Sequence, residues 1–262
     1  MPIITLTTDW GLKDYYVSAV KGRILSQLPE ANIVDISHLA PSFDLIQSSF
    51  IFLNSYKNFP EGTIHIIDVN SIREDEEESE YVAIAHDNHF FVGCDNGFFS
   101  IVFPETPQKI VQLATGKKLI STFPTLDIFV EAACHLANGN SINDLGNDRT
   151  FINRKLTLLP VVDDKVIRGS IAYIDSYKNL ITNVDKALFE KMADGRKFTI
   201  FIRSFEYEIN KISTTYSEVE RGEKLALFNS SGFLEIAINK GPAASLLGLK
   251  NGDSIRIEFY DN

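Results

Sequence analysis

The alternation of strand-like and helix-like segments near the N-terminus constrains the fold more than any other feature of this sequence. Residues 2–8 are apolar and β-branched, which suits a buried strand, and Asp9-Trp10-Gly11 ends the run. Strand-like runs recur at residues 31–36 and 62–69, and apolar side chains at helical spacing fill the intervals, residues 15–28 and 45–56. This order predicts an α/β domain in which helices cover a parallel sheet.

The pattern after the third strand is less regular. Two short strands, residues 82–85 and 90–93, flank a predicted Asp87-Asn88 hairpin turn, and residues 127–137 have helical spacing. Residues 140–155 are polar and irregular, so we expect a connector there.

The C-terminal part of the chain changes to short β-like runs separated by turns. Strong turn signals are Asn229-Ser230-Ser231-Gly232 and Lys250-Asn251-Gly252-Asp253. The runs are residues 169–174, 198–202, 224–229, 234–239 and 254–259. We therefore predict two domains, an α/β domain at residues 1–157 and a smaller, mostly antiparallel β domain at residues 158–262.

Composition narrows the function classes. The 262 residues include 35 acidic and 25 basic side chains, for a net charge of −10, which argues against a nucleic-acid partner. The two cysteines form no disulfide framework, and the cysteines and histidines lack metal-ligand spacing, so no metal is expected. We find no run long enough to span a membrane and no signal peptide. The expectation is a cytoplasmic protein without a membrane partner.

Asp9 is the first candidate for chemistry because it follows the first strand, where open α/β sheets gather their ligands. A carboxylate there can accept hydrogen bonds from both hydroxyls of a ribose, or it can simply cap the next helix. Aromatic residues beside turns, among them Phe43, Phe123 and Tyr177, are candidates for stacking on a flat base, although most aromatic side chains must belong to the core.

Two polar sets in the β domain leave two interpretations open. The first set is Asp175-Ser176-Tyr177-Lys178-Asn179, followed by Thr182-Asn183. The second set contains Asn229, Ser230 and Ser231, whose amides and hydroxyls can hold a carboxylate. Both compositions are also typical of plain turns between strands. A ligand site at a domain interface is the alternative.

The order of the segments resembles the S-adenosyl-L-methionine hydroxide adenosyltransferase family, relatives of fluorinase and chlorinase. The resemblance begins at Thr7-Thr8-Asp9-Trp10-Gly11-Leu12-Lys13-Asp14 and continues in collinear blocks over essentially the whole chain. Further blocks are Val34-Asp35-Ile36-Ser37-His38, Phe59 to His65, Asp95-Asn96-Gly97, Asp127-Ile128-Phe129, Asp175 to Asn183 and Asn229 to Ala237.

The resemblance implies a Rossmann-like domain, a β-barrel-like domain and a homotrimer that binds S-adenosylmethionine between neighbouring subunits. It also implies attack of water at the ribose C5′, which gives adenosine and methionine without a metal or redox cofactor. By matching position, Asp9 holds the ribose hydroxyls and Phe43 packs near the ribose or the sulfonium. Asp175 and Ser230 bind the two ends of methionine, Tyr177 and Asn179 contact adenine, and Thr125 lies close to the nucleophile.

The chain departs from the Asp-Arg-His set of the family's hydroxide-forming members. Counting from the predicted strand end at Val69, Asn70 takes the Asp position, and Asp68 lies two residues earlier, on the same side of the strand. Pro124 replaces the histidine, and Arg73 is the nearest arginine, beside the acidic run of residues 74–80. Neither an amide nor a proline takes a proton from water.

Two hypotheses follow. One is a slow hydrolase in which Asp68 or the acidic run supplies the base, with Asn70 and Thr125 beside it. The other is a protein that binds S-adenosylmethionine or adenosine without turnover.

Overall fold

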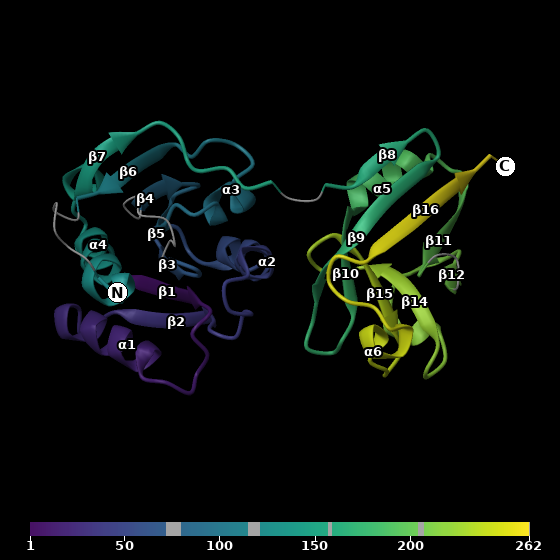
Figure 1. Cartoon of the computed structure of the whole chain (residues 1–262), viewed down its shortest axis with the longest axis horizontal. Helices are drawn as coiled ribbons and strands as arrows, with labels where there is room; N and C mark the ends of the chain where they lie inside the picture. The colour runs from purple at the N-terminus through teal and green to yellow at the C-terminus, as the bar shows by residue number, and fades with distance from the viewer. Residues whose placement is uncertain (72–79, 115–120, 157–158, 204–206, 262) are drawn as a thin grey trace. The chain divides into compact units, whose positions relative to one another are not determined.

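The computed structural model describes residues 1–71, 80–114, 121–156, 159–203 and 207–261. These residues divide into two compact units, Met1–Leu156 and Thr157–Asn262 (Figure 1).

The first unit is built on a seven-stranded sheet with the order β2-β1-β3-β5-β4-β6-β7. The strands β2, β1, β3 and β5 run parallel, whereas β4, β6 and β7 are antiparallel to their neighbours. The predicted parallel sheet is therefore confirmed, with an antiparallel extension at one edge. The strands are β1 (Ile3–Thr8), β2 (Asn32–Ser37), β3 (Ile64–Asp68), β4 (Tyr81–His86), β5 (His89–Cys94), β6 (Lys109–Leu113) and β7 (Gly146–Arg149).

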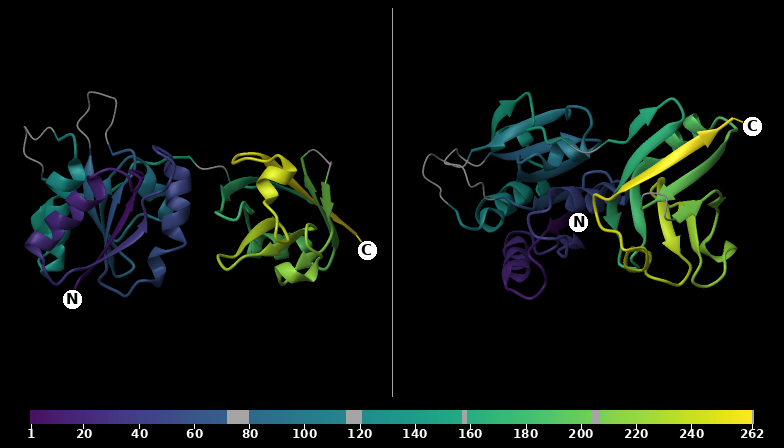
Figure 2. Two further views of the ribbon diagram at one scale, coloured as in Figure 1. Left: turned by 90° about the horizontal axis from the view of Figure 1, so that it is seen from below. Right: turned by 45° about the vertical axis from the view of Figure 1, so that its right-hand side comes forward.

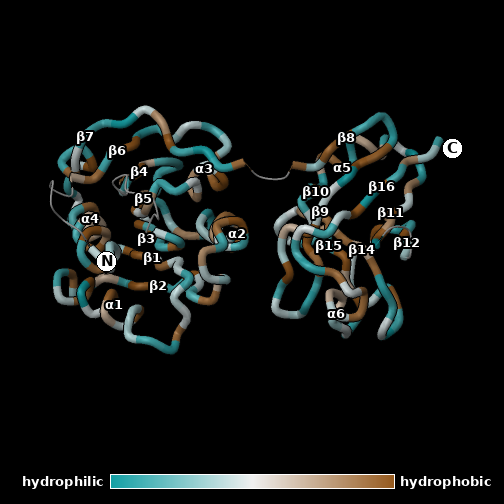
Figure 3. The backbone as a smooth tube through the Cα atoms, viewed as in Figure 1, coloured by the Kyte–Doolittle hydropathy of each residue, from teal (hydrophilic) through white to brown (hydrophobic). Residues whose placement is uncertain are grey.

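Helices cover both faces of this sheet. Helices α1 (Tyr16–Gln27) and α4 (Val130–Ala137) contribute to one apolar core, and α2 (Leu45–Leu53) and α3 (Phe98–Val102) contribute to the core on the other face. Figure 2 shows the sheet between these helical layers, and Figure 3 shows the hydrophobic stretches of its strands and of α2. A π-helical turn, Thr125–Phe129, precedes α4.

Local sequence explains where several elements begin and end. Asp44 starts α2 because its side chain accepts the backbone N–H groups of Ile46 and Gln47. The predicted Asp87-Asn88 hairpin turn between β4 and β5 is confirmed, and both residues have positive φ angles, 50° and 60°. Helix α2 ends at Leu53, short of the predicted residue 56, and a 3₁₀ turn (Tyr56–Asn58) follows.

One expectation about the first unit is wrong. The polar connector predicted at residues 140–155 contains a 3₁₀ turn (Ile142–Leu145) and strand β7, which pairs antiparallel with β6. The sequence Gly146-Asn147-Asp148-Arg149 lacks apolar alternation, so pairing with an existing sheet edge decides its conformation.

The second unit is a nearly closed, barrel-like sheet of nine strands, which confirms the predicted mostly antiparallel β architecture. Strand β12 lies near β14, so the two ends of the sheet approach each other. Its core is rich in isoleucine and leucine. The strands are β8 (Val161–Asp163), β9 (Val166–Ile174), β10 (Leu180–Asp185), β11 (Lys197–Ile202), β12 (Tyr207–Ile209), β13 (Ile212–Ser213), β14 (Lys224–Phe228), β15 (Phe233–Ile238) and β16 (Ser254–Tyr260); the helices are α5 (Lys186–Ala193) and α6 (Ala243–Leu247), with a 3₁₀ turn at Tyr216–Glu218.

Within the described ranges, no helix has the length and apolar character needed to cross a membrane.

Candidate active site

The carboxyl ends of β1 and β3 border a pocket of about 370 Å³ in the first unit. Five residues predicted for the site line it: Asp9, Phe43, Asp68, Asn70 and Phe123. The other lining residues are Trp10, Tyr16, Ser42, Ser71, Thr122 and Pro124. The parallel strands explain this gathering, because their carboxyl ends lie at one edge of the sheet.

Asp9 does not cap a helix, so that alternative is wrong. Helix α1 begins at Tyr16, and its N-terminus has no side-chain cap. Instead, Asp9 Oδ2 accepts the backbone N–H of Phe43 at 2.7 Å. Its Oδ1 accepts no hydrogen bond within the described ranges and remains available to a ligand hydroxyl.

His38 holds the loop that carries Asp9 in place. The backbone N–H of Gly11, whose φ of 73° suits glycine, donates to the His38 carbonyl at 2.7 Å. The His38 ring is buried, lies 2.7 Å from the Thr8 hydroxyl through Nδ1 and stacks on Trp10. His38, the last residue of the block Val34 to His38, thus supports the end of β1.

Asp68 is a carboxyl group of this pocket whose pKa is shifted. It is the last residue of β3, it is 6% exposed, and its Oδ2 accepts the hydroxyl hydrogen of the fully buried Thr125. Burial raises its pKa to about 6, and the charge of Asp9 acts in the same direction. The hydroxyls of Ser71 and Thr125 oppose the rise. Ser71 does so without a hydrogen bond of good geometry. Such a group is largely ionised at neutral pH and can accept a proton.

The strand boundary changes the interpretation of Asn70. Strand β3 ends at Asp68, not at Val69, and Asn70 has a left-handed φ of 49°. The expectation that Asn70 and Asp68 share one side of a strand is therefore wrong, although both line the pocket. Asp68 is thus the carboxylate that stands where the strand passes into its loop. Pro124, which the resemblance places at the family's histidine position, also lines the pocket.

Aromatic rings form one wall of the pocket. Phe123 contacts Trp10 and Tyr16 edge to face, with centroid distances of 5.1 and 5.3 Å. Phe43 is 72% exposed and has a positive φ of 66°, a strained conformation for a bulky residue. Its backbone N–H bond to Asp9 holds that conformation.

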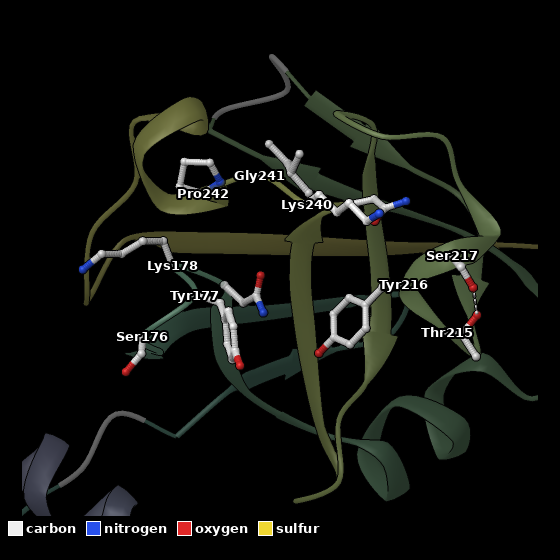
Figure 4. A pocket seen from close by; sticks show the side chains of 12 residues that line it. Ser176, Tyr177, Lys178, Thr215, Tyr216, Ser217, Lys240, Gly241 and Pro242 are labelled. Atoms are coloured by element: carbon white, nitrogen blue, oxygen red, sulfur yellow. Dashed lines mark hydrogen bonds between the residues drawn. The ribbon is translucent and has the colours of Figure 1, made fainter.

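A second pocket, of about 990 Å³, lies in the second unit (Figure 4). Tyr177 and Asn179, both predicted for adenine, line it, and the rings of Tyr177 and Tyr216 flank the same space. The remaining lining residues are Ser176, Lys178, Thr215, Ser217, Ile238, Asn239, Lys240, Gly241 and Pro242. Asp175, Asn229, Ser230 and Ser231 lie outside this lining.

Asp175 shapes the turn that carries Tyr177. Its carboxylate accepts the backbone and side-chain N–H groups of Asn179 at 2.8 and 3.2 Å, and Lys178 takes a positive φ of 70°. The turn interpretation of residues 175–179 is therefore confirmed, and the turn presents two side chains to the pocket. Thr182 and Asn183 do not belong to it, because both lie within β10.

The turn interpretation also holds for residues 229–232. Asn229 Oδ1 accepts the N–H groups of Ser231 and Phe233 at 3.0 and 3.1 Å, and Ser230 and Ser231 are exposed at the tip. Behind this turn lies Glu235, which is 3% exposed.

Sequence reasoning missed Tyr216 and Glu235. The Tyr216 hydroxyl donates to Glu235 Oε1 at 2.8 Å, which fixes the ring at the pocket wall. Burial raises the pKa of Glu235, and Asp175 acts in the same direction, while the hydrogen bonds from Tyr216 and Asn229 oppose the rise. A glutamate inside an apolar strand, Phe233–Ile238, was the available signal.

Three predicted features remain to be placed. Arg73 and residues 74–79 of the acidic run lie outside the described residues. Glu80, the last residue of the run, pairs with Arg149 at 2.7 Å and does not line the pocket. Cys94 and Cys134 are free and buried. Within the described ranges, no group of three or more His, Cys, Asp or Glu side chains is placed to hold a metal ion.

Comparisons with known proteins agree over the full chain. The N-terminal domain model of the SAM hydroxide adenosyltransferases matches residues 4–146, and the C-terminal domain model matches residues 169–256. The (R)-S-adenosyl-L-methionine hydrolase of Methanocaldococcus jannaschii is 29% identical, covering 99% of this chain and 97% of the relative. A fluorinase of Actinoplanes sp. is 23% identical, covering 98% of this chain and 97% of the relative. A crystal structure of a conserved protein from Thermotoga maritima superposes with a TM-score of 0.86 at 29% identity, over 97% of this chain and 99% of that one.

Proposed function

The chain belongs to the SAM hydroxide adenosyltransferase family, and from this premise we propose that it hydrolyses S-adenosyl-L-methionine to adenosine and L-methionine. One observation carries the proposal beyond family membership. Asp68, a buried carboxyl with a pKa raised to about 6, lines the same pocket as Asp9 and is oriented by Thr125. A base is therefore available even though Asn70 and Pro124 cannot act as one.

The proposed reaction is a single displacement. The oxygen of a water molecule forms a bond to the ribose C5′ while the C5′–sulfur bond breaks, and the bonding electron pair leaves with methionine as its neutral thioether sulfur. The Asp68 carboxylate takes the proton that the water loses. Positive charge on sulfur disappears as the bond breaks, so a site with little solvating water favours the transition state over the sulfonium ground state.

In this proposal, the remaining residues bind the substrate. Asp9 accepts the ribose hydroxyls through Oδ1, and Phe43 and Phe123 border the ribose and sulfonium side. In the second unit, Tyr177 and Tyr216 stack on adenine beside Asn179. Methionine binds through Asp175 and the turn formed by Asn229, Ser230 and Ser231.

We further propose a homotrimer in which one ligand uses the first unit of one subunit and the second unit of its neighbour. Support comes from the family resemblance and from the fact that each unit carries a pocket with part of the predicted residue set. Action in the cytoplasm, without metal, redox cofactor, nucleic acid or membrane partner, is also part of the proposal. The net charge of −10 supports the exclusion of nucleic acid.

The test is incubation of the purified full chain with S-adenosylmethionine, with adenosine and methionine quantified by chromatography. We expect the two products in equal amounts and a rate well above that of the uncatalysed control. Tight adenosine binding by calorimetry without adenosine release would refute hydrolysis and favour the binding protein. Absence of both binding and turnover would refute the ligand assignment as well. Sedimentation equilibrium tests the trimer separately.

A further inference from the structure

Asp95-Asn96-Gly97 is one sequence block that the proposed reaction leaves without a role. It follows β5, and none of its residues lines the pocket of the first unit. The block nevertheless reaches the loop that begins at Asp68. Asn96 Nδ2 donates to the carbonyl oxygens of both Val69 and Asn70, each at 2.8 Å.

The orientation of the Asn96 amide is determined by a third bond. The backbone N–H of Phe98 donates to Asn96 Oδ1 at 3.2 Å. Because a backbone N–H needs an acceptor, the side-chain oxygen must face Phe98, and the NH₂ group must face the two carbonyls. The side chain therefore acts as a clamp between the start of α3 and the residues after β3.

The segment held by this clamp leaves β3 through a residue with a positive φ. Asn70 has a φ of 49°, in the left-handed region. Asp68 precedes this segment directly, and Asp68, Asn70 and Ser71 all line the pocket. Release of the Val69 and Asn70 carbonyls therefore frees the backbone that aims the proposed base.

The clamp is itself anchored by residues 149–155, none of which lines the pocket of the first unit. The fully buried Asp95 carboxylate accepts the backbone N–H of Asn153 at 3.0 and 2.8 Å and lies 3.1 Å from an Arg149 nitrogen. At Gly97, which has a φ of 100°, an added Cβ would lie 2.7 Å from the Lys155 Cβ. The segment of residues 149–155 thus fixes the position from which Asn96 reaches the loop.

We infer that Asn96 is a positioning residue for the reaction: it holds the Val69–Asn70 backbone so that the Asp68 carboxylate faces the attacking water. This inference rests on the proposed function. It assigns to Asn96 an effect on the chemical step and not on ligand binding, since its side chain lies outside both pockets.

The experiment compares Asn96→Ala and Asn96→Asp with wild type in S-adenosylmethionine turnover and in adenosine calorimetry. Asn96→Asp keeps the acceptor for Phe98 but turns a carboxylate oxygen toward two carbonyls. Misplacement of a reacting group by about 1 Å costs on the order of 100-fold in rate. We expect kcat to fall by about 10- to 100-fold in Asn96→Ala and at least as far in Asn96→Asp. The KM and the adenosine Kd should stay within about threefold of wild type.

Asn54→Ala is the matched control. Asn54 is also partly buried in the first unit, and its amide donates to one backbone carbonyl, that of Phe50 at 2.7 Å, away from the pocket. We expect this variant to retain wild-type kcat. An equal loss of kcat in Asn54→Ala, or wild-type kcat in Asn96→Ala, would overturn the inference.

A readout without turnover separates this inference from the proposed function. Amide hydrogen exchange, followed by mass spectrometry on peptides covering residues 64–71, should be faster in Asn96→Ala than in wild type and unchanged in Asn54→Ala. If the wild-type protein releases no adenosine, the proposed function fails, and unchanged exchange in Asn96→Ala would then also refute the clamp. If the wild-type protein is inactive but exchange is faster in Asn96→Ala, Asn96 does hold the Val69–Asn70 backbone. Its role in the reaction would then be refuted, because the protein would catalyse no such reaction.

Discussion

Replacement of Asp68 by asparagine should abolish most of the activity and at the same time stabilise the protein. Asparagine has the same shape, and its Oδ1 can still accept the Thr125 hydroxyl, but it takes no proton from water. A positioned general base is worth about 10²- to 10⁴-fold in rate, so we expect kcat to fall by that range.

The pH dependence of kcat in the wild-type protein should follow the titration of Asp68. The Asp68 pKa, raised from 3.8 to about 6, means that the carboxyl is protonated and inactive below pH 6 and ionised above it. We expect kcat to rise about tenfold per pH unit below pH 6 and to level off above pH 7. The residual activity of Asp68→Asn should not show this rise of kcat with pH below pH 6.

Asp68→Asn should lower activity but raise the free energy of unfolding. A carboxyl with a raised folded-state pKa contributes stability that is fully present below pH 4 and is lost as the pH rises through 6. The rise from 3.8 to about 6 corresponds to about 3 kcal/mol, which the folded protein loses on ionising Asp68. Asp68→Asn should therefore raise the free energy of unfolding at pH 8 by up to about 3 kcal/mol.

The assays are adenosine release from pH 5 to 8 and urea unfolding at pH 8. Asp148→Asn is the matched control, because Asp148 is an exposed carboxylate in the same unit, paired with Lys109. Wild-type kcat in Asp68→Asn, or a flat wild-type profile between pH 5 and 8, would refute the assignment of the base. A variant less stable than wild type at pH 8 would refute the argument from burial.

Three further predictions concern binding and stability. Asp9→Ala should weaken adenosine binding by about 10- to 100-fold in calorimetry, because a charged acceptor for hydroxyls is lost; an unchanged Kd would contradict the ribose role. His65 has a pKa lowered to about 3 by burial and by His89, so it contributes stability that is present above pH 6.5 and is lost as the pH falls toward 3. Its contribution to the free energy of unfolding should drop by about 2 kcal/mol between pH 7 and pH 5, so His65→Gln should show a correspondingly smaller pH dependence in urea unfolding. Tyr216→Phe should destabilise the fold by about 1–3 kcal/mol in thermal unfolding, because the buried Glu235 loses a donor; an unchanged melting temperature would contradict the role of this bond.

The sequence predicted the strands and helices that have a clear hydrophobic period. The β1 and β3 runs, helix α1 and the Asp87-Asn88 turn follow from local patterns, since apolar spacing and turn chemistry act over a few residues. Elements whose sequence is polar were missed for the same reason. Strand β10 contains Thr182 and Asn183, and Asn183 Oδ1 accepts the Ser170 N–H at 2.8 Å, a bond that exists only once the strands are paired.

The sequence by itself determined the α/β domain, the β domain, the family resemblance and the candidate side chains Asp9, Asp68 and Tyr177. Tertiary structure decided which of them share a pocket and what surrounds each side chain. Burial by the surrounding protein raises the pKa of Asp68, and Asp9, brought to the same pocket by the sheet, adds to the rise. The Thr125 hydroxyl, which a π-helical turn brings to the Asp68 carboxylate, opposes it. Those partners are far apart in the chain, and desolvation depends on the whole packed unit, so no local pattern encodes either effect.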